Sequence, residues 1–475
     1  MARSALAPDW LAEPDDADAL PPGVFPASAH RGADGELVLG GVRASELVAR
    51  HGSPLYVVDE EEFRGRAAHV RHALSTAFEH VGAGVRVYYG GKAFLSASSA
   101  AWVAEAGLGV DVCTGGELAV ALAAGVDPAL IGVHGNNKSD EEIAAAVQAG
   151  AGSIVIDNVP EIARIAAAAE RAGKVQPVRL RVSNGVHAST HDFLATAHED
   201  QKFGVPLSGA AEVVARIRSQ PWLRFLGLHC HIGSQIFGPA GFQESALRLL
   251  EVHARLLADG PVPELNLGGG IGIAYTAADR PEPVDELARA LASTVGTECA
   301  RLGIPVPLLC FEPGRYIAGP SGVTLYTVGA VKPVEVAEGV ERWYVAVDGG
   351  MSDNPRPALY EADYTVRIAG RASRRPPVLV RVVGKHCESG DIVVPADYLP
   401  ADVQPGDVLA VGATGAYCWS LASNYNHIGR PPVVAVRDGA SRVIVRGETL
   451  ADVLARDCGI EDPEAAAAAT GWEKR

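Results

Sequence analysis

The 475-residue sequence lacks any CxxC pair, any strongly basic cluster and any apolar run of membrane-spanning length. Its seven cysteines are widely spaced and odd in number, which argues against a disulfide framework and favours a reducing compartment. The formal charge of -16, from 41 basic and 57 acidic residues, argues against nucleic acid as a partner. No export signal is visible either, so we expect a cytoplasmic protein that binds a small molecule and no membrane.

Eight short apolar segments indicate β-strands, and Ala-rich stretches of helical length separate them. Helix-start signals support the alternation, since Ser139 precedes Glu142 by three residues and Thr114 precedes Gly115. The pattern predicts an α/β fold, a TIM-like (β/α)8 barrel. The expected strands are residues 85–89, 109–113, 130–134, 153–157, 178–182, 225–229, 264–267 and 308–311, and the clearest helices are 139–149, 160–172, 241–257 and 283–302.

After residue 323 the pattern changes to short alternating strands between Gly, Pro and Asp turns, which predicts a second, all-β and Greek-key-like domain. Residues 36–40 could add a strand to it, which would make that domain discontinuous. The expected boundaries are a flexible tail over 1–28, an N-terminal part of the β-domain over 29–53, the barrel over 54–322, the β-domain over 323–460 and a second tail over 461–475.

Polar residues follow the expected barrel strands at their carboxyl ends, where the active sites of such barrels lie. Random scatter would not place them there strand after strand. They are Lys92, Asp111, His134, Asp157, Asn184, His229, His231, the glycines Gly268, Gly269 and Gly270, and Glu312 with Arg315.

Lys92 lies among small residues after the first barrel strand. A partly desolvated lysine there loses its proton more readily and can form a Schiff base with an aldehyde. The alternative is an ordinary surface lysine at a strand end, which this position alone does not exclude.

The run Gly268 to Gly270 allows close approach of the backbone to a ligand and directs N–H groups at an anion such as phosphate. A dinucleotide fingerprint fails on context, because the next convincing helix begins only near Pro283. A plain barrel turn is the structural alternative.

His229 and His231 lie two apart on one expected strand, so zinc is an obvious alternative ligand. The adjacent residues His386, Cys387 and Glu388 cannot supply the missing ligands, because they cannot all point one way. We therefore expect no metal. A structural ion pair is the corresponding alternative for Glu312 and Arg315.

Taken together, a Schiff-base lysine, a glycine turn, a histidine, a carboxylate and an arginine describe a pyridoxal 5'-phosphate site. The carboxylate would keep the pyridine nitrogen protonated, so that the ring accepts the electrons of a carbanion.

The sequence also resembles the fold-type III pyridoxal-phosphate enzymes, and among them the diaminopimelate decarboxylase family, from about residue 54 to 446. The resemblance rests on an ordered set of motifs: Gly91 to Phe94, Asp111 to Leu118, His229 to Ser234, Gly268 to Gly270, Glu312 to Arg315, Asp348 to Gly350, Arg356 to Tyr360, Cys387 to Asp391 and Gly415 to Tyr417.

The resemblance implies the role of each residue. Lys92 would hold the cofactor, His231 would stack on its ring, Glu312 would pair with the ring nitrogen and Cys387 would donate a proton. The implied cofactor-binding positions are Lys92, Asp111, His231, Ser234, Gly268, Gly269, Gly270, Glu312, Gly314, Arg315 and Tyr417, and the implied substrate-binding positions are Arg315, Arg356, Tyr360, Glu388 and Tyr417.

The implied reaction converts meso-2,6-diaminopimelate to L-lysine and carbon dioxide, the last step of lysine biosynthesis. Arginines suit the distal carboxylate of this substrate and Glu388 its ammonium. The family further implies a homodimer in which Cys387 and Glu388 complete the neighbouring subunit's site. The alternative is a related decarboxylase for another basic amino acid or polyamine precursor.

Overall fold

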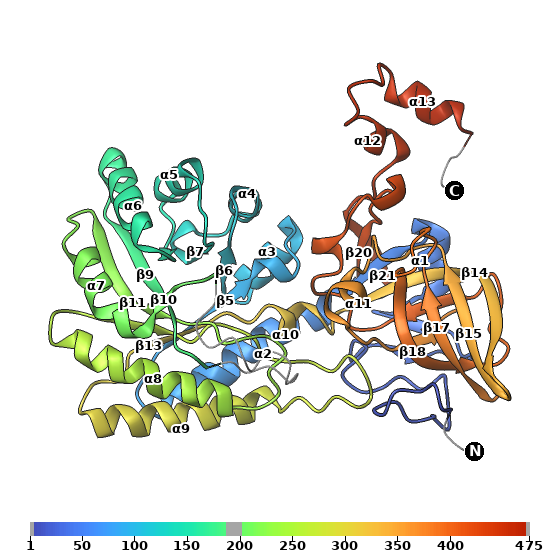
Figure 1. Cartoon of the computed structure of the whole chain (residues 1–475), viewed down its shortest axis with the longest axis horizontal. Helices are drawn as coiled ribbons and strands as arrows, with labels where there is room; N and C mark the ends of the chain where they lie inside the picture. The colour runs from blue at the N-terminus through green and yellow to red at the C-terminus, as the bar shows by residue number, and fades with distance from the viewer. Residues whose placement is uncertain (1–3, 187–201, 472–475) are drawn as a thin grey trace. The chain divides into compact units, whose positions relative to one another are not determined.

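The computed structural model describes residues 4–186 and 202–471, and the chain divides into two compact units (Figure 1). The barrel unit comprises Arg64–Gly272 and Arg280–Ile317. The β-unit comprises the described residues of Met1–Phe63, Ile273–Asp279 and Ala318–Arg475.

Eight parallel strands form the closed barrel, which confirms the predicted fold. The sheet runs β9-β11-β12-β13-β5-β6-β7-β8, and a further β8–β9 pairing closes it. Every residue of β6, β7, β8 and β12 is buried, as is typical of parallel strands that are covered on both faces. The strands are β5 (Val85–Gly90), β6 (Gly109–Val112), β7 (Ile131–Val133), β8 (Ser153–Ile156), β9 (Gln176–Ser183), β11 (Leu223–His229), β12 (Glu264–Asn266) and β13 (Leu308–Phe311), with the short β10 (Val205–Pro206) beside β9.

Helices connect the barrel strands and pack against one another in chain order, with α3 against α4, α5 against α6 and α8 against α9. The predicted capping box is present at α5, where Ser139 Oγ accepts from Glu142 N and Glu142 Oε2 accepts from Ser139 N. The helices are α2 (Glu60–Glu79), α3 (Ala97–Glu105), α4 (Gly115–Ala123), α5 (Asp140–Ala149), α6 (Val159–Ala172), α7 (Ala210–Arg218), α8 (Ala240–Leu257), α9 (Val284–Leu302) and the short α10 (Arg315–Ala318).

A buried ion pair near the starts of the strands fills the end of the barrel opposite the strands' carboxyl ends. Arg179 donates to Glu264 Oε2 from Nε at 3.0 Å and from a terminal nitrogen at 2.7 Å. The same guanidinium reaches Ser153 Oγ at 2.7 Å and Tyr88 OH at 2.9 Å, and Arg86 donates to the other Glu264 oxygen at 2.9 Å. A fully satisfied pair of this kind is costly to break from one side.

The β-unit is built on a nine-stranded sheet with β14 (Gly322–Ala337) near its centre. The predicted change to short strands after residue 323, and with it a separate β-domain, is confirmed. The other strands are β4 (Leu55–Asp59), β15 (Val340–Val347), β16 (Val366–Ile368), β17 (Pro377–Val383), β18 (Ile392–Pro400), β19 (Val408–Val411), β20 (Val433–Arg437) and β21 (Ala440–Val445); its helices are α1 (Ala44–His51), α11 (Arg356–Tyr360), α12 (Leu450–Leu454) and α13 (Pro463–Ala469).

The boundary between the units differs from the expected residue 54. β4 pairs antiparallel with β14 and parallel with β20, so it belongs to the β-unit. Residues 36–40 do provide a strand, β2 (Leu37–Leu39), but it joins a separate small sheet with β1 (His30–Arg31) and β3 (Val42–Arg43). Gly40 and Gly41, both with positive φ, turn the chain back between β2 and β3.

The expected flexible tail over 1–28 is a second difference, because its described part packs on the β-unit. Leu6, Trp10 and Leu11 contact a cluster that contains Leu379 and Tyr398. These apolar side chains anchor a segment whose Pro and Asp content had suggested mobility.

None of the helices within residues 4–186 and 202–471 combines the length and the apolar character needed to cross a membrane.

Replacement of Glu264 by alanine should destabilise the barrel unit by about 3–5 kcal/mol, because Arg179 would be left buried without its carboxylate. Urea unfolding followed by circular dichroism measures the change. Glu212→Ala is the matched control, since it breaks an exposed pair with Arg216 and should cost under about 1 kcal/mol. Equal losses of stability in the two variants would show that the buried Arg179–Glu264 pair does not stabilise the barrel unit more than an exposed pair does.

Candidate functional site

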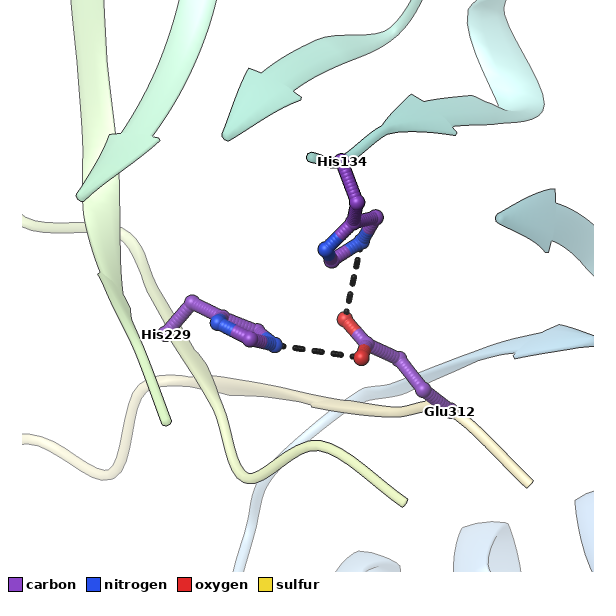
Figure 2. Close-up of side chains that lie close together, drawn as sticks. All are labelled: His134, His229 and Glu312. Carbon is purple, nitrogen blue, oxygen red and sulfur yellow. Dashed lines mark hydrogen bonds and ion pairs between the residues drawn. The ribbon is translucent and has the colours of Figure 1, made fainter. Parts of the chain in front are cut away.

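Glu312 stands at the centre of the polar groups at the carboxyl ends of the barrel strands. Figure 2 shows His134 and His229 approaching its two carboxylate oxygens from different strands. His229 Nε2 lies 3.1 Å from Oε2, and His134 Nε2 lies 3.3 Å from Oε1. Asn266 Nδ2 donates to Oε1 at 2.6 Å. The carboxylate is therefore held in place by three side chains.

The electrostatics of this group favour an ionised Glu312. Burial would raise its pKa, but His229 and His134 hold the pKa of this carboxyl well below its ordinary value. Burial would lower the pKa of His134, yet the carboxylates of Glu312 and Asp111 raise it to about 9. Burial lowers the pKa of His229 to about 4, so this ring is neutral at pH 7.

Asp111 lies on the other side of His134. Its Oδ1 is 3.3 Å from His134 Nε2. Burial, followed by repulsion from Glu312, raises the pKa of Asp111 to about 6. Room for the carboxylate depends on Gly132 of β7, since a Cβ there would lie 2.4 Å from Asp111 Oδ1. A protonated His134 thus lies between two carboxylates.

The glycine turn after β12 is tied to this carboxylate by Asn266. Asn266 Oδ1 accepts from Gly268 N at 2.8 Å while its amide nitrogen binds Glu312. Gly269 N donates to His231 Nδ1 at 3.2 Å. Two of the three amides expected to face an anion are thus already hydrogen-bonded within the protein.

Close packing of the backbone explains why the turn consists of glycine. A Cβ at Gly269 would lie 2.0 Å from the carbonyl oxygen of Glu312, and one at Gly268 or Gly270 would lie 2.6 or 2.4 Å from other carbonyl oxygens. Gly268 and Gly270 also have positive φ. Close backbone packing therefore accounts for the run, as the alternative of a plain barrel turn requires.

A polar group suited to an anion lies next to that end. Gly270 packs against Gly233, and the neighbouring Ser234 Oγ accepts from Arg315 at 2.7 Å. Arg315 begins α10 immediately after Gly314, where a Cβ would lie 2.9 Å from the carbonyl oxygen of Gly90. Ser234, Gly270 and Arg315 thus form one cluster.

Lys92 follows β5 in a short 3-10 turn, Gly91–Ala93. Its side chain is exposed, whereas the sequence suggested partial desolvation. His231 lies beyond the end of β11, and burial, with a smaller contribution from the nearby Lys92 charge, lowers its pKa to about 3. His231 is therefore a neutral ring near the lysine.

The β-unit contains the remaining expected site residues. Arg356 begins α11, is buried, and stacks on the rings of Tyr275 at 4.8 Å and Tyr417 at 5.9 Å. It also donates to Tyr364 OH. Tyr417 has a positive φ of 68°. Arg356 and Tyr417 therefore lie together, as a guanidinium within an aromatic cluster.

Tyr360, Cys387 and Glu388 are exposed on the same unit. These three residues belong to the β-unit, whereas Glu312, His134 and His229 belong to the barrel unit.

Sequence reasoning missed the connecting roles of His134 and Asn266. His134 was noted at a strand end but received no role, and Asn266 was read only as part of a strand. The signal available for both was a polar residue at the carboxyl end of a barrel strand. Asn266 also lies two residues before the glycine turn that begins at Gly268. Tyr275 and Tyr364 were missed because only their contacts with Arg356 distinguish them.

Glu312 with His134 and His229, called here the Glu312 group, can bind either of two kinds of cation. Candidate ligand atoms of His134, His229 and Glu312 lie within 4.8 Å of one another, which would suit a metal ion. An ionised carboxylate equally suits the protonated nitrogen of a heterocycle. Within the described residues, Asp111 Oδ2 and His229 Nδ1 are buried without a hydrogen-bond partner, as expected of a site completed by a polar ligand. Together with Lys92 and the Ser234–Arg315 cluster, these groups fit pyridoxal phosphate.

Replacement of His134 by glutamine should destabilise the protein in a pH-dependent manner. The folded protein retains the His134 proton up to about pH 9, whereas the unfolded chain releases it near 6.5. The charged ring therefore contributes roughly 3 kcal/mol below pH 6.5, and this contribution is lost as the pH rises through 9. Urea unfolding at several pH values measures the difference.

His253→Gln is the control for this prediction. Burial lowers the pKa of His253 to about 4, so between about pH 7.5 and 9.5 this ring is neutral in both the folded and the unfolded protein, and its replacement should have a constant effect over that range. A His134→Gln effect that is also constant with pH would show that His134 is not charged.

Comparison with known proteins agrees with the geometry. The family model for the pyridoxal-dependent decarboxylase, pyridoxal binding domain, matches residues 67–319, which is nearly the whole barrel unit. The cofactor of the family is thus the one that the Glu312, Lys92 and Arg315 groups fit.

Relatives and solved structures cover almost the full chain. Diaminopimelate decarboxylase of Mycobacterium bovis is 48% identical over 92% of this chain and 98% of its own, and that of Bacillus subtilis is 42% identical over 90% and 97%. The crystal structure of the M. jannaschii diaminopimelate decarboxylase in complex with L-lysine matches with a TM-score of 0.84 and 31% identity, over 91% of this chain and 98% of that one. The chain therefore belongs to the pyridoxal-phosphate-dependent decarboxylases of fold-type III and, within them, to the diaminopimelate decarboxylase family.

Proposed function

We propose that this protein converts meso-2,6-diaminopimelate to L-lysine and carbon dioxide with pyridoxal phosphate. The observation that carries the proposal is the ionised Glu312 carboxylate at the barrel mouth, in a chain that aligns with diaminopimelate decarboxylases over nine-tenths of its length. The L-lysine in the M. jannaschii structure is the product expected here and supports the same reaction.

The barrel unit would hold the cofactor. Lys92 would bind its aldehyde carbon, Glu312 would accept a hydrogen bond from its protonated ring nitrogen, and the neutral His231 would pack against its ring. Ser234, Arg315 and the glycine turn with Gly314 would serve its phosphate, joined by Tyr417 of the β-unit, and Asp111 would act through His134. When bound, pyridoxal phosphate supplies a ring that accepts the electron pair of the carbon–carbon bond that breaks.

The β-unit supplies residues for the distal end of the substrate. That end is a zwitterion, and the Arg356 guanidinium matches its carboxylate with a planar pair of donors. Contacts with the rings of Tyr275, Tyr364 and Tyr417 fix the position of the guanidinium. Glu388 would accept from the distal ammonium, and Tyr360 and Arg315 would line the same substrate.

Cys387 would donate the proton that replaces the lost carboxylate. Its exposed thiol can transfer that proton to the substrate carbon, and the thiolate then regains a proton from water. His231 remains neutral near the lysine and does not compete for this role.

We also propose a cytoplasmic homodimer with shared active sites. Leu359 and Tyr360 on α11 are 60% and 64% exposed, on the unit that also exposes Cys387 and Glu388. Exposed apolar side chains next to functional residues are typical of a surface that a second subunit covers. Recovery of activity on mixing inactive Lys92→Ala with inactive Cys387→Ala tests this arrangement.

Lys92→Ala should abolish the visible absorbance of the bound cofactor and its fixation to the protein by borohydride, because no other group would hold the aldehyde covalently. Absorbance spectra and peptide mapping after reduction provide the measurement. Lys174→Ala is the control, since this exposed lysine only donates to the carbonyl oxygen of Gln148. A Lys92→Ala spectrum identical to that of the wild type would refute the role of Lys92.

Carbon dioxide release should be far faster from meso-diaminopimelate than from ornithine or arginine, which lack a distal carboxylate. Arg356→Met or Glu388→Gln should lower kcat/KM for diaminopimelate by about 10- to 100-fold, because each removes a hydrogen bond to a charged group. Glu338→Gln, in an exposed turn of the same unit, is the control. Equal rates with ornithine would place the protein in another branch of the family.

A further inference from the structure

The turn after β15 has a structure that the proposed reaction does not explain. In the Asp348, Gly349 and Gly350 motif, a Cβ at Gly349 would lie 2.1 Å from Asp353 Oδ2, and one at Gly350 would lie 2.5 Å from Asp391 Oδ1. The glycines therefore make room for two carboxylates. One of them, Asp391, belongs to the loop that carries Cys387.

The Asp391 carboxylate joins the turn to this loop. It is 3% exposed, and its Oδ1 accepts from Met351 N at 2.6 Å while its Oδ2 accepts from His386 N at 2.7 Å. Gly384 approaches from the other side, because a Cβ there would lie 2.3 Å from Oδ2. Each oxygen is thus bound by a backbone amide from a different segment.

The ring of His386 provides a second attachment. Its Nε2 lies 2.9 Å from Ser352 Oγ, its Nδ1 lies 3.0 Å from Asn426 Oδ1, and the ring stacks on Tyr425 with centroids 5.1 Å apart. The residue immediately before Cys387 is therefore fixed through both its backbone and its side chain.

The loop closes on itself beyond these attachments. Gly384 N donates to the carbonyl oxygen of Asp391 at 3.1 Å, and Asp391 N donates to that of Glu388 at 3.1 Å. Cys387 and Glu388 remain exposed at the tip. The part of the loop around Gly384, His386 and Asp391 is thus held by hydrogen bonds, while the side chains of Cys387 and Glu388 are exposed to solvent.

We propose that Asp391 is a positioning residue that sets the location of Cys387 and Glu388 for protonation and substrate binding. This inference rests on the proposed function, since it assumes that the two residues act on the substrate. It explains why the glycine motif after β15 accompanies the Cys387 loop, although neither glycine needs to touch a ligand.

The geometry requires a carboxylate. Asparagine has the same shape but one oxygen, so its NH2 group would face either the Met351 or the His386 amide, donor against donor. One segment would have to move away from the other. A displacement of about 1 Å in a reacting group can cost roughly 100-fold in rate.

The test compares Asp391→Asn with Asp438→Asn, an exposed aspartate in the same unit. We expect kcat to fall by about 100-fold in Asp391→Asn, with unchanged cofactor absorbance and cofactor affinity. Hydrogen exchange should accelerate in peptides that contain Met351 and His386, and nowhere in the barrel unit. Asp438→Asn should match the wild type in all four measurements.

Subunit mixing assigns the defect to the loop. Asp391→Asn mixed with Lys92→Ala should restore about a quarter of the wild-type sites, because half of the dimers are hybrid and each hybrid has one intact site. Asp391→Asn mixed with Cys387→Ala should restore none. The mixture of Lys92→Ala with Cys387→Ala is the reference, because its hybrid dimers should also contain one intact site each. If this mixture regains no activity, the result counts against active sites shared between subunits.

Wild-type kcat and wild-type exchange in Asp391→Asn would overturn the inference, as would restored activity with Cys387→Ala. If Asp391→Asn does not fold, Ser352→Ala removes the contact with the His386 ring, together with a longer hydrogen bond to Asp353 Oδ1 at 3.3 Å. It should lower kcat with unchanged cofactor affinity, and unchanged kcat would again overturn the inference. A wild-type protein that binds no pyridoxal phosphate would instead refute the proposed function.

Discussion

The arrangement of the site depends on the cost of burying the charge of Glu312. An ionised carboxylate in a barrel interior is unstable unless its oxygens are bound, and here two imidazoles and an amide bind them. Those partners come from different strands, so the carboxylate joins the ends of β7, β11 and β12 to its own segment. The positions of Asp111 and of the glycine turn depend on these partners in turn, because Asp111 contacts His134 and Gly268 N donates to Asn266.

The sequence predicted the barrel well because parallel strands are buried on both faces and leave short, mainly apolar segments, as in β8 and β13. The same regularity placed the polar residues at the strand ends. Features that depend on contacts between distant segments could not be found in this way. The packing of Gly269 against Glu312, the pairing of β4 with β14 and the attachment of residues 4–28 to Leu379 are all of this kind.

The two units divide the chemistry between them. The barrel unit gathers groups that suit an aromatic, anionic cofactor, namely the Glu312 carboxylate and the Ser234–Arg315 cluster. The β-unit contains a guanidinium supported by tyrosines and a rigid loop with an exposed thiol. Each set is organised by its own unit, which explains why residues with no proposed contact of their own to a ligand, such as Asp391 and Asn266, have closely fixed geometry.

The placement of β4 has a consequence for synthesis on the ribosome. This strand emerges early, and all five of its residues are buried in the finished fold, yet its neighbours β14 and β20 are translated only after the complete barrel. An apolar strand with unpaired edges tends to associate with other chains. The nascent polypeptide must therefore shield this strand, or have it shielded by a chaperone, until the last third of the protein has left the exit tunnel.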